Sequence, residues 1–483
     1  MRYLLEGHAF KNAVQDLLIC LFPDERHTAA EDGAGDDLCR VAIEPEDGAE
    51  YVCVTVRRGG RLTEERSGAL PSEDGEEAHA ERASQVRETL YLALLPHLSA
   101  PPVWGSMTGV KPAKAARLYM ESGHSEAEAE CMLAEKYFVT PRRRRLCVAA
   151  AKCAMEEAVT LAPREAQLYI GIPFCPAKCS YCSFVSNNIQ RSGHLVEPYL
   201  ETLLAEIAAA GEMTEKNGVI IGSIYIGGGT PTVLDEAQLG RLLRAAERAF
   251  DRSGCREYTV EAGRPETITR EKLALMRDFG VDRISINPQS MDDGVLAGVG
   301  RRHTAEDIEN AYRMARATGE FIINMDLIAG LPGDAPEGFL QSVRRVAALE
   351  PENITVHSLA RKHGAAMAAC APDWLDAGTM DRAYEYLEER GYEPYYIYRQ
   401  KYIAGGLENT GFCRRGARSR YNICMMEELG DVIALGAGGV SKLCSMGGRR
   451  VRRVANPKYP LEYIQGGEEI CRRKRELTLI FEG

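Results

Sequence analysis

The sequence has 483 residues, too many for one small binding module and enough for about three domains of about 150 residues each. Its 59 lysines and arginines against 70 aspartates and glutamates give a net charge of -11, which disfavours nucleic acid as a partner. With 45% hydrophobic and 27% charged residues, the composition is that of a folded globular protein and not of a disordered one.

The amino-terminal stretch contains apolar residues, but Glu6, Lys11 and Asp16 interrupt them at short intervals. This pattern fits neither a signal peptide nor a membrane span, and no other run reaches the roughly 18 apolar residues that a span needs. We therefore expect no membrane span and a cytoplasmic location. Thiols stay reduced in that compartment, so a clustered subset of the 15 cysteines is expected to bind metal or act in catalysis.

Residues 1–100 show the pattern of a small α+β domain. Helices are predicted at 11–22 and 76–95, and alternating apolar residues predict strands at 38–43 and 51–57. Gly59 and Gly60 after the second strand predict a hairpin turn. Pro101 and Pro102 then mark a break, and residues 101–165 are predicted to form a helical connector. Its basic run at 142–145 is typical of a solvated helix face, with a patch for an anionic partner as the alternative.

From residue 166 onward, short apolar strands alternate with amphipathic helices. The strands are predicted at 168–172, 224–226, 258–261, 283–286, 322–328 and 354–357, and the helices at 195–210, 238–250, 305–317 and 338–349. Thr304 with Asp307 is a capping box that begins the third of these helices. The alternation predicts a parallel sheet in a full or partial barrel, with functional residues at the carboxyl ends of the strands. We place the barrel core at 166–350 and a carboxyl-terminal extension that closes the barrel at 351–483.

A cysteine triplet follows the first barrel strand, where residues 169–182 read YIGIPFCPAKCSYC. Cys175, Cys179 and Cys182 lie in one short loop, which brings three thiolates together as ligation of an iron–sulfur cluster requires. Three cysteines leave one iron of a cubane cluster open for a substrate or cofactor. The alternative is a structural zinc site with His194 as fourth ligand.

Polar residues and glycines mark the ends of the next strands. Gly227 to Gly229, within GGGTPT, allow close approach of the backbone to a ligand. The third strand ends at Glu261, Gln289 follows the fourth strand, and Asp326 lies within the fifth. Arg301 lies in the segment between the fourth and fifth strands. Together these groups predict a ligand site at one end of the barrel.

The cysteine triplet resembles that of the radical S-adenosylmethionine (SAM) superfamily, in which such a loop holds a [4Fe-4S] cluster whose open iron chelates SAM. Residues 169 to about 443 resemble the oxygen-independent coproporphyrinogen III oxidase family, and most of all its coproporphyrinogen dehydrogenase (HemZ-type) branch. The motifs that carry this resemblance are WGSMTGVKP at 104–112, YTVEAGRP at 258–265, YRQK at 398–401 and LGAGGVSK at 435–442. The resemblance implies an α/β fold with a partial, three-quarter TIM-like (βα)6 radical SAM barrel, an amino-terminal α+β domain and an extension that completes the active site.

The resemblance also implies roles for individual residues. Cys175, Cys179 and Cys182 would hold the cluster, and Tyr169, Gly229 and Glu261 would contact the SAM on its open iron. The family can bind a second SAM, and its contacts match Tyr181, Thr230, Gln289, Arg301, Asp326 and Ala360.

The implied activity is oxidative decarboxylation of coproporphyrinogen III to protoporphyrinogen IX in anaerobic haem biosynthesis. A 5'-deoxyadenosyl radical from SAM would remove a hydrogen from the β-carbon of a propionate, and loss of carbon dioxide and one further electron would leave a vinyl group. Two such events would give protoporphyrinogen IX. The cluster would be reduced by a partner such as flavodoxin or ferredoxin. Because the tetrapyrrole substrate carries four carboxylates, Arg264 and Arg399 are candidates by position for its binding.

Two departures from the family pattern keep other functions open. The fourth cysteine that the best-studied branch carries two residues after the third is Phe184 here, and a related haem-carrying branch also lacks it. That carrier branch typically has a His-Asn pair where this sequence has Tyr421 and Asn422, and we expect Tyr421 to be packed or hydrogen-bonded. A haem-trafficking protein and a radical SAM methyltransferase acting on haem are therefore the alternatives.

Overall fold

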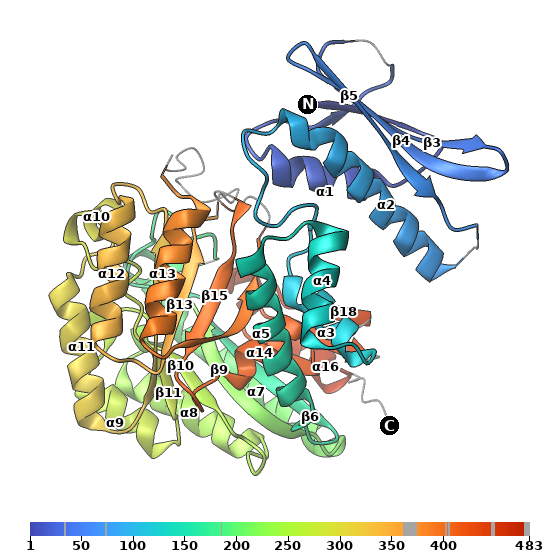
Figure 1. Cartoon of the computed structure of the whole chain (residues 1–483). Coiled ribbons are helices and arrows are strands. Elements are labelled where there is room, and N and C mark those ends of the chain that lie inside the picture. The colour runs from blue at the N-terminus through green and yellow to red at the C-terminus, as the bar shows by residue number, and fades with distance from the viewer. Residues whose placement is uncertain are drawn as a thin grey trace. The chain divides into compact units, whose positions relative to one another are not determined.

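The computed structural model describes residues 1–32, 35–72, 75–184, 186–360, 374–400, 403, 406–445 and 450–477. The chain divides into two compact units, whose helices and strands are labelled in Figure 1. Unit 1 consists of Met1–Val148 and Arg399–Glu408, and unit 2 consists of Ala149–Tyr398 and Asn409–Gly483. The domain limits placed at residues 100, 165 and 350 from the sequence remain predictions.

Unit 1 begins with a mixed sheet covered by two helices. In the described residues its strand order is β2 (Thr28–Ala29), β1 (Arg2–Glu6), β3 (Leu38–Glu46), β4 (Ala49–Arg58) and β5 (Arg61–Ala69). Helices α1 (Lys11–Leu21) and α2 (Glu76–Leu94, followed by the 3-10 turn η1, Leu95–His97) share a buried apolar core with β3 and β4. The predicted hairpin is confirmed: Arg58 pairs with Arg61 across Gly59 and Gly60, which both have positive φ angles as the tight turn requires. The sequence did not reveal β1 or β2, and it indicated β5 only through the hairpin turn.

The predicted connector is helical, with α3 (Pro112–Glu121), α4 (Glu126–Tyr137) and α5 (Pro141–Ala158), which contains the boundary between the units. The solvated-face interpretation of its basic run is wrong for Arg143, which is 1% exposed. Arg143 forms an ion pair of 3.1 Å with the buried Glu408, and the indole of Trp104 donates a 2.8 Å hydrogen bond to the same carboxylate. A buried charge needs such partners, because desolvation would otherwise destabilise the fold.

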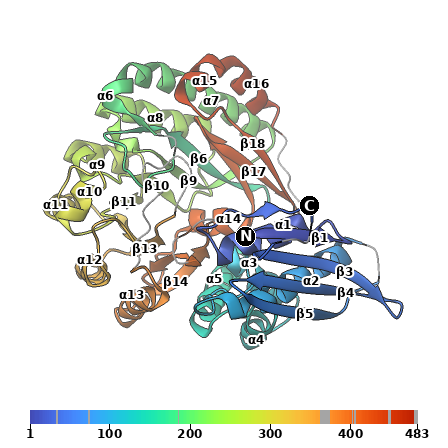
Figure 2. The ribbon, with the colours of Figure 1, turned by 90° about the horizontal axis from the view of Figure 1, so that it is seen from above.

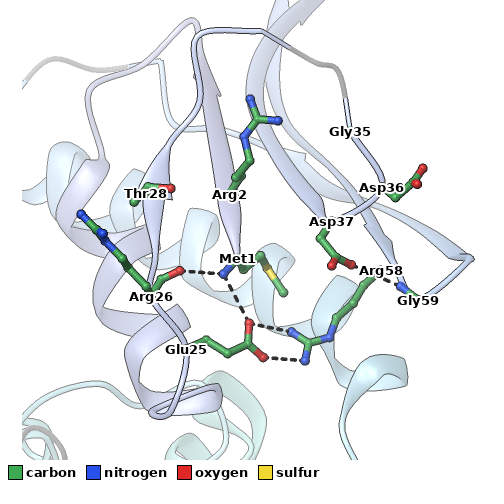
Figure 3. Close-up of a pocket in the computed structure, with 10 residues that line it drawn as sticks. All are labelled: Met1, Arg2, Glu25, Arg26, Thr28, Gly35, Asp36, Asp37, Arg58 and Gly59. Carbon is green, nitrogen blue, oxygen red and sulfur yellow. Dashed lines mark hydrogen bonds and ion pairs between the residues drawn. The ribbon is translucent and has the colours of Figure 1, made fainter.

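Unit 1 also contains an open pocket of about 470 Å³ lined by the start of the chain and the β4–β5 turn (Figure 3). Glu25 lies at its centre, where it accepts hydrogen bonds from the Met1 amino group and from both terminal nitrogens of Arg58. The guanidinium of Arg58 also lies 4.1 Å from the centre of the Phe22 ring. These pairs satisfy the charges of Glu25 and Arg58 within the fold.

Unit 2 is built on a sheet whose central strands run parallel. In the described residues the parallel series is β6 (Glu165–Ile172), β9 (Ile220–Gly228), β10 (Tyr258–Glu261), β11 (Arg283–Ser285), β12 (Ile322–Ala329) and β13 (Asn353–Ser358). These strands match the six predicted from the sequence and confirm the (βα)6 arrangement of a partial barrel. Figure 2 shows the connecting helices on the outer side of the strands.

The helices between these strands confirm the predicted alternation. Their bounds are α6 (Ile189–Ser192), α7 (Val196–Lys216), α8 (Glu236–Ala249), α9 (Arg270–Asp278), α10 (Asp293–Gly298), α11 (Ala305–Thr318) and α12 (Pro336–Ala348), with the 3-10 turns η2 (Gly193–Leu195), η3 (Pro231–Val233) and η4 (Pro265–Thr267). The capping box of Thr304 and Asp307 begins α11 as predicted. In the described residues, no helix is both long and apolar enough to cross a membrane.

The carboxyl-terminal extension adds strands to both edges of the parallel series. Strand β15 (Asn409–Cys413) pairs antiparallel with β13 and with β14 (Glu393–Tyr398). Strand β16 (Asp431–Leu435) pairs parallel with β6 and is followed by β17 (Val440–Ser445) and β18 (Arg450–Ala455). Over the described residues the sheet runs from β14 to β18 without closing, so the expectation that the extension closes the barrel is wrong. The remaining helices are α13 (Ala377–Glu389), α14 (Arg420–Glu427), α15 (Pro460–Gln465) and α16 (Gly467–Arg475).

Candidate functional site

The cysteine loop follows β6 at the carboxyl end of the parallel strands. Cys175 ends the short strand β7 (Phe174–Cys175), which pairs with β8 (Asn187–Asn188). Cys179 and Cys182 lie in one turn, because the Cys182 amide donates to the Cys179 carbonyl at 3.1 Å. Burial raises the pKa of the Cys175 and Cys182 thiols, and the charge of the Cys179 thiolate raises both further. The three thiols are thus close enough to interact electrostatically.

The donor set fits an iron–sulfur cluster better than a single zinc ion. His194, the proposed fourth zinc ligand, is exposed on η2. Among the residues that the structure describes, no three side chains of the types His, Cys, Asp and Glu converge on the position of one metal ion. In a cluster each cysteine ligates its own iron, so the three sulfurs need only surround a common space.

The glycine motif at the end of β9 lies beside the cysteine loop. The Gly229 amide donates to the Ile172 carbonyl at 2.8 Å, and the Thr230 amide donates to the Phe174 carbonyl at 2.8 Å. A Cβ atom on Gly229 would lie 2.4 Å from the Phe174 carbonyl oxygen, which excludes any side chain there. The Thr230 hydroxyl lies 3.5 Å from the Cys175 sulfur, so this turn contacts the first cysteine directly.

Glu261, at the end of β10, is hydrogen-bonded to β9. Its carboxylate accepts a hydrogen bond of 2.5 Å from the Tyr225 hydroxyl and one of 3.2 Å from the Gly228 amide. Burial, reinforced by the charge of Asp326, nevertheless raises the pKa of Glu261 to about 7. Glu261 is therefore a half-buried acid that changes its charge near neutral pH.

Three tyrosine rings are stacked next to this acid. Tyr225 lies between Tyr169 of β6, at a ring distance of 6.3 Å, and Tyr421 of α14, at 4.5 Å. Tyr421 is 4% exposed and its hydroxyl has no hydrogen-bond partner among the described residues. The expectation that Tyr421 is a packed residue is confirmed. Tyr225 was not among the predicted site residues. Residues two positions apart on a strand face the same side, so Tyr225 of β9 faces the same side as Gly227 of the glycine motif.

Asp326, on β12, belongs to a second polar group that includes His357 at the end of β13. Their closest atoms are 3.9 Å apart, and Asn324 donates a 2.8 Å hydrogen bond to the Asp326 carboxylate. Burial acts to raise the pKa of Asp326, but its interaction with His357 lowers that pKa below the ordinary value. The other ring nitrogen of His357 lies 3.3 Å from the Tyr398 hydroxyl and 3.3 Å from the Asn409 side chain. His357 was not among the predicted site residues, although its place at the end of the sixth strand was a signal for it.

Arg301, Tyr181 and Gln289 form a third group. Arg301 donates to the Tyr181 hydroxyl at 3.3 Å and to the carbonyl of Asn287, so it connects the cysteine loop with the segment after β11. Gln289 has a φ angle of +70°, and its amide donates to the Asp326 carbonyl at 2.8 Å. The structure thus brings the predicted residues of β11 and β12 together through the backbone.

The other predicted residues are distributed between the two units. Ala360 follows β13 in unit 2. Arg264, also in unit 2, donates to the Cys179 sulfur and the Ala177 carbonyl, both at 2.9 Å. Arg399 belongs to unit 1, where it donates to the Met107 carbonyl. The YRQK motif ends at Lys401, which lies outside the described residues.

Comparison with known proteins agrees with this arrangement. The radical SAM superfamily model matches residues 169–346. The chain is 37% identical to the oxygen-independent coproporphyrinogen-III oxidase-like protein HemZ of Bacillus subtilis, over 90% of this chain and 89% of that protein. It is also 31% identical to the heme chaperone HemW of Bacillus subtilis, over 61% of this chain and 75% of that protein.

A solved structure supports the same fold. The coproporphyrinogen III oxidase HemN from Escherichia coli, described as a radical SAM enzyme, superimposes with a TM-score of 0.51 at 24% identity. The match covers 65% of this chain and 72% of HemN. Extended similarity to HemZ and HemW, together with the cysteine loop on the first strand of a partial barrel, shows that this chain belongs to the radical SAM superfamily and, within it, to the family of oxygen-independent coproporphyrinogen III oxidases and their relatives.

Proposed function

We propose that this protein is an oxygen-independent coproporphyrinogen III oxidase that converts two propionates of coproporphyrinogen III into the vinyl groups of protoporphyrinogen IX. The observation that carries this proposal is the 37% identity to HemZ, because it extends over 90% of the chain. HemZ is itself named as oxidase-like. Similarity of this extent includes both the cysteine loop and the strand ends that carry the polar groups.

Membership of the radical SAM superfamily implies a [4Fe-4S] cluster and SAM. Bound together, they would supply a 5'-deoxyadenosyl radical able to take a hydrogen from the β-carbon of a propionate. The vinyl group would then form by loss of carbon dioxide and of one further electron to an electron acceptor. In our proposal Cys175, Cys179 and Cys182 hold the cluster at the carboxyl end of β6. Burial of two of these ligands would also limit the access of water, since Cys175 and Cys179 are 8% and 5% exposed, whereas Cys182 is half-buried.

The SAM on the cluster is proposed to lie against Tyr169, Gly229 and Glu261. The Glu261 carboxylate can pair with the ammonium group of SAM. The missing side chain of Gly229 lets its turn pack against the Phe174 carbonyl, so that it lies beside the cysteine loop. A second SAM is proposed to contact a larger group of residues, which are Tyr181, Thr230, Gln289, Arg301, Asp326 and Ala360.

Binding of the four substrate carboxylates is assigned to arginines. Arg264 and Arg399 stay the candidates, and Arg264 has one terminal nitrogen, Nη1, without a hydrogen-bond partner in the described residues. Arg399 is 7% exposed, and burial lowers the pKa of its guanidinium. We further propose that a one-electron carrier such as flavodoxin or ferredoxin reduces the cluster.

Isotope transfer tests the proposed reaction. The reconstituted protein is incubated anaerobically with SAM, a reductant and coproporphyrinogen III carrying deuterium at the β-carbons of its propionates. We expect deuterium in the 5'-deoxyadenosine that forms. Deoxyadenosine free of deuterium, formed at the same rate with and without the porphyrinogen, would show that this tetrapyrrole is not the substrate.

Haem carriage is the second candidate, because the chain is 31% identical to a heme chaperone and lacks the fourth cysteine. Phe184 stands at that position and is 67% exposed. A carrier would bind haem stoichiometrically and release it unchanged, which titration of the Soret band would reveal. A methylated haem product would indicate a methyltransferase instead.

A further inference from the structure

The central cysteine of the loop lies against arginine side chains from two other parts of unit 2. Arg264, just after β10, donates from Nη2 to the Cys179 sulfur at 2.9 Å. Arg301, after α10, donates to the Tyr181 hydroxyl within the same loop at 3.3 Å. Burial acts to lower the pKa of Arg301, but the charges of Tyr181 and Cys179 raise it above its ordinary value. Positive charge is therefore concentrated at this one thiol.

Arg264 is fixed in this position and only partly neutralised. It is 4% exposed, and the same Nη2 atom that contacts Cys179 donates to the Ala177 carbonyl at 2.9 Å. Its nearest carboxylate, Glu266, lies 3.6 Å from Nη1, beyond hydrogen-bonding distance. Glu266 is shared with His303, whose ring nitrogen lies 3.0 Å away. Glu266 therefore compensates the positive charge of Arg264 only in part, and the remaining positive potential acts on the cysteine loop.

We infer that Arg264 is a positioning residue for the cluster and raises its reduction potential. Reduction adds one electron to the cluster and makes it more negative, so a nearby cation and an N–H···S hydrogen bond stabilise the reduced state. The electron comes from the one-electron carrier, and no proton needs to move. This inference rests on the cluster proposed at Cys175, Cys179 and Cys182. Arg264 would then have a role at the cluster in addition to the substrate binding proposed for it above.

Two substitutions are expected to change the potential in opposite directions. Arg264→Gln removes the cation, so the cluster should become harder to reduce. Glu266→Gln removes the anion next to that cation, so the cluster should become easier to reduce. Loss of packing alone would not produce opposite shifts. Arg313→Gln is the control, because Arg313 lies on α11 and is 62% exposed.

The experiment measures the midpoint potential of the cluster in the reconstituted full chain, without SAM, by a redox titration followed by electron paramagnetic resonance. Iron and sulfide are determined for every variant. At the wild-type midpoint potential, we expect the ratio of reduced to oxidised clusters to fall about tenfold in Arg264→Gln, which is the effect of losing one charge-assisted hydrogen bond. Glu266→Gln should raise that ratio, and Arg313→Gln should leave it unchanged.

An unchanged potential in Arg264→Gln with full iron content would overturn the inference. If Arg264→Gln retains no iron, Glu266→Gln decides: a higher potential supports the role of Arg264, and an unchanged one refutes it. Failure of the wild-type protein to take up a cluster would instead contradict the proposed cluster site, and the inference would fall with it.

Discussion

The two half-buried acids of the barrel, Glu261 and Asp326, have opposite pKa shifts because their partners differ. Glu261 is bonded to the neutral Tyr225 and Gly228, so burial dominates and raises its pKa to about 7. Asp326 has His357 beside it, and this interaction outweighs burial and lowers the pKa of Asp326. At neutral pH Asp326 is therefore charged, whereas Glu261 is present both as the carboxylate and as the protonated acid.

SAM binding is predicted to depend on pH through Glu261. The carboxylate attracts the ammonium group of SAM and the protonated acid does not, so affinity should rise as Glu261 ionises. With a pKa of about 7, its charged fraction increases about tenfold from pH 6 to pH 8. Equilibrium binding of SAM to the reconstituted protein should strengthen accordingly, and Glu261→Gln should abolish the dependence. A pH profile of Glu261→Gln equal to that of the wild type would refute this role.

Tyr225→Phe tests the hydrogen bond that stabilises the Glu261 carboxylate. The hydroxyl of Tyr225 acts to lower the pKa of Glu261, so its removal should raise that pKa. The midpoint of SAM binding should then move to higher pH while the maximal affinity changes little. The same pH titration measures it, and a shift to lower pH would contradict the expected sign.

Cys179→Ala is expected to prevent cluster retention, because two thiolates cannot hold a site-differentiated cubane cluster. Iron content and the brown absorbance should be lost after anaerobic reconstitution. Cys131→Ala, at an exposed position of α4, is the matched control and should retain full iron. If Cys179→Ala keeps its iron, the ligand assignment is wrong.

At the level of elements, the buried Glu206 of α7 joins the carboxyl-terminal helices to the barrel. Its carboxylate accepts hydrogen bonds from the Gly436 amide at 2.8 Å and from the Tyr463 hydroxyl, and it pairs with Lys474 of α16 at 3.1 Å. Gly436 belongs to the LGAGGVSK motif, and a Cβ atom there would lie 2.5 Å from the Gly171 carbonyl at the end of β6. This motif therefore anchors β16 beside the strand that carries the cysteine loop.

Removal of Glu206 should destabilise this arrangement strongly. Glu206→Ala leaves Lys474 buried without its partner, which costs about 3–5 kcal/mol. Glu212→Ala, on the same helix, removes an exposed pair with Arg475 of α16 and should cost far less, because solvent screens exposed ion pairs. Urea unfolding of the two variants compares the losses. If both variants lower the free energy of unfolding equally, the buried network of Glu206 stabilises the fold no more than the exposed pair of Glu212 does.

At the level of the whole molecule, the sequence was sufficient to predict the parallel strands, the cysteine loop and the residues at the strand ends. The periodicity of apolar residues and the spacing of motifs are local properties of the sequence, so they can be recognised without knowledge of the fold. Partners distant in sequence could not be predicted: Arg143 pairs with Glu408, and Tyr225 stacks on Tyr421, across hundreds of residues. Strands β14 to β18 were missed as elements because strands of only five or six residues carry little periodic signal.

The central claim, oxidation of coproporphyrinogen III, is tested most directly by product analysis. The reconstituted protein is incubated anaerobically with SAM, a reductant, an electron acceptor and coproporphyrinogen III, and tetrapyrroles and nucleosides are identified by mass spectrometry. We predict the mono- and didecarboxylated porphyrinogens together with 5'-deoxyadenosine. Deoxyadenosine without any decarboxylated tetrapyrrole, from a protein with full cluster content, would contradict the proposed activity.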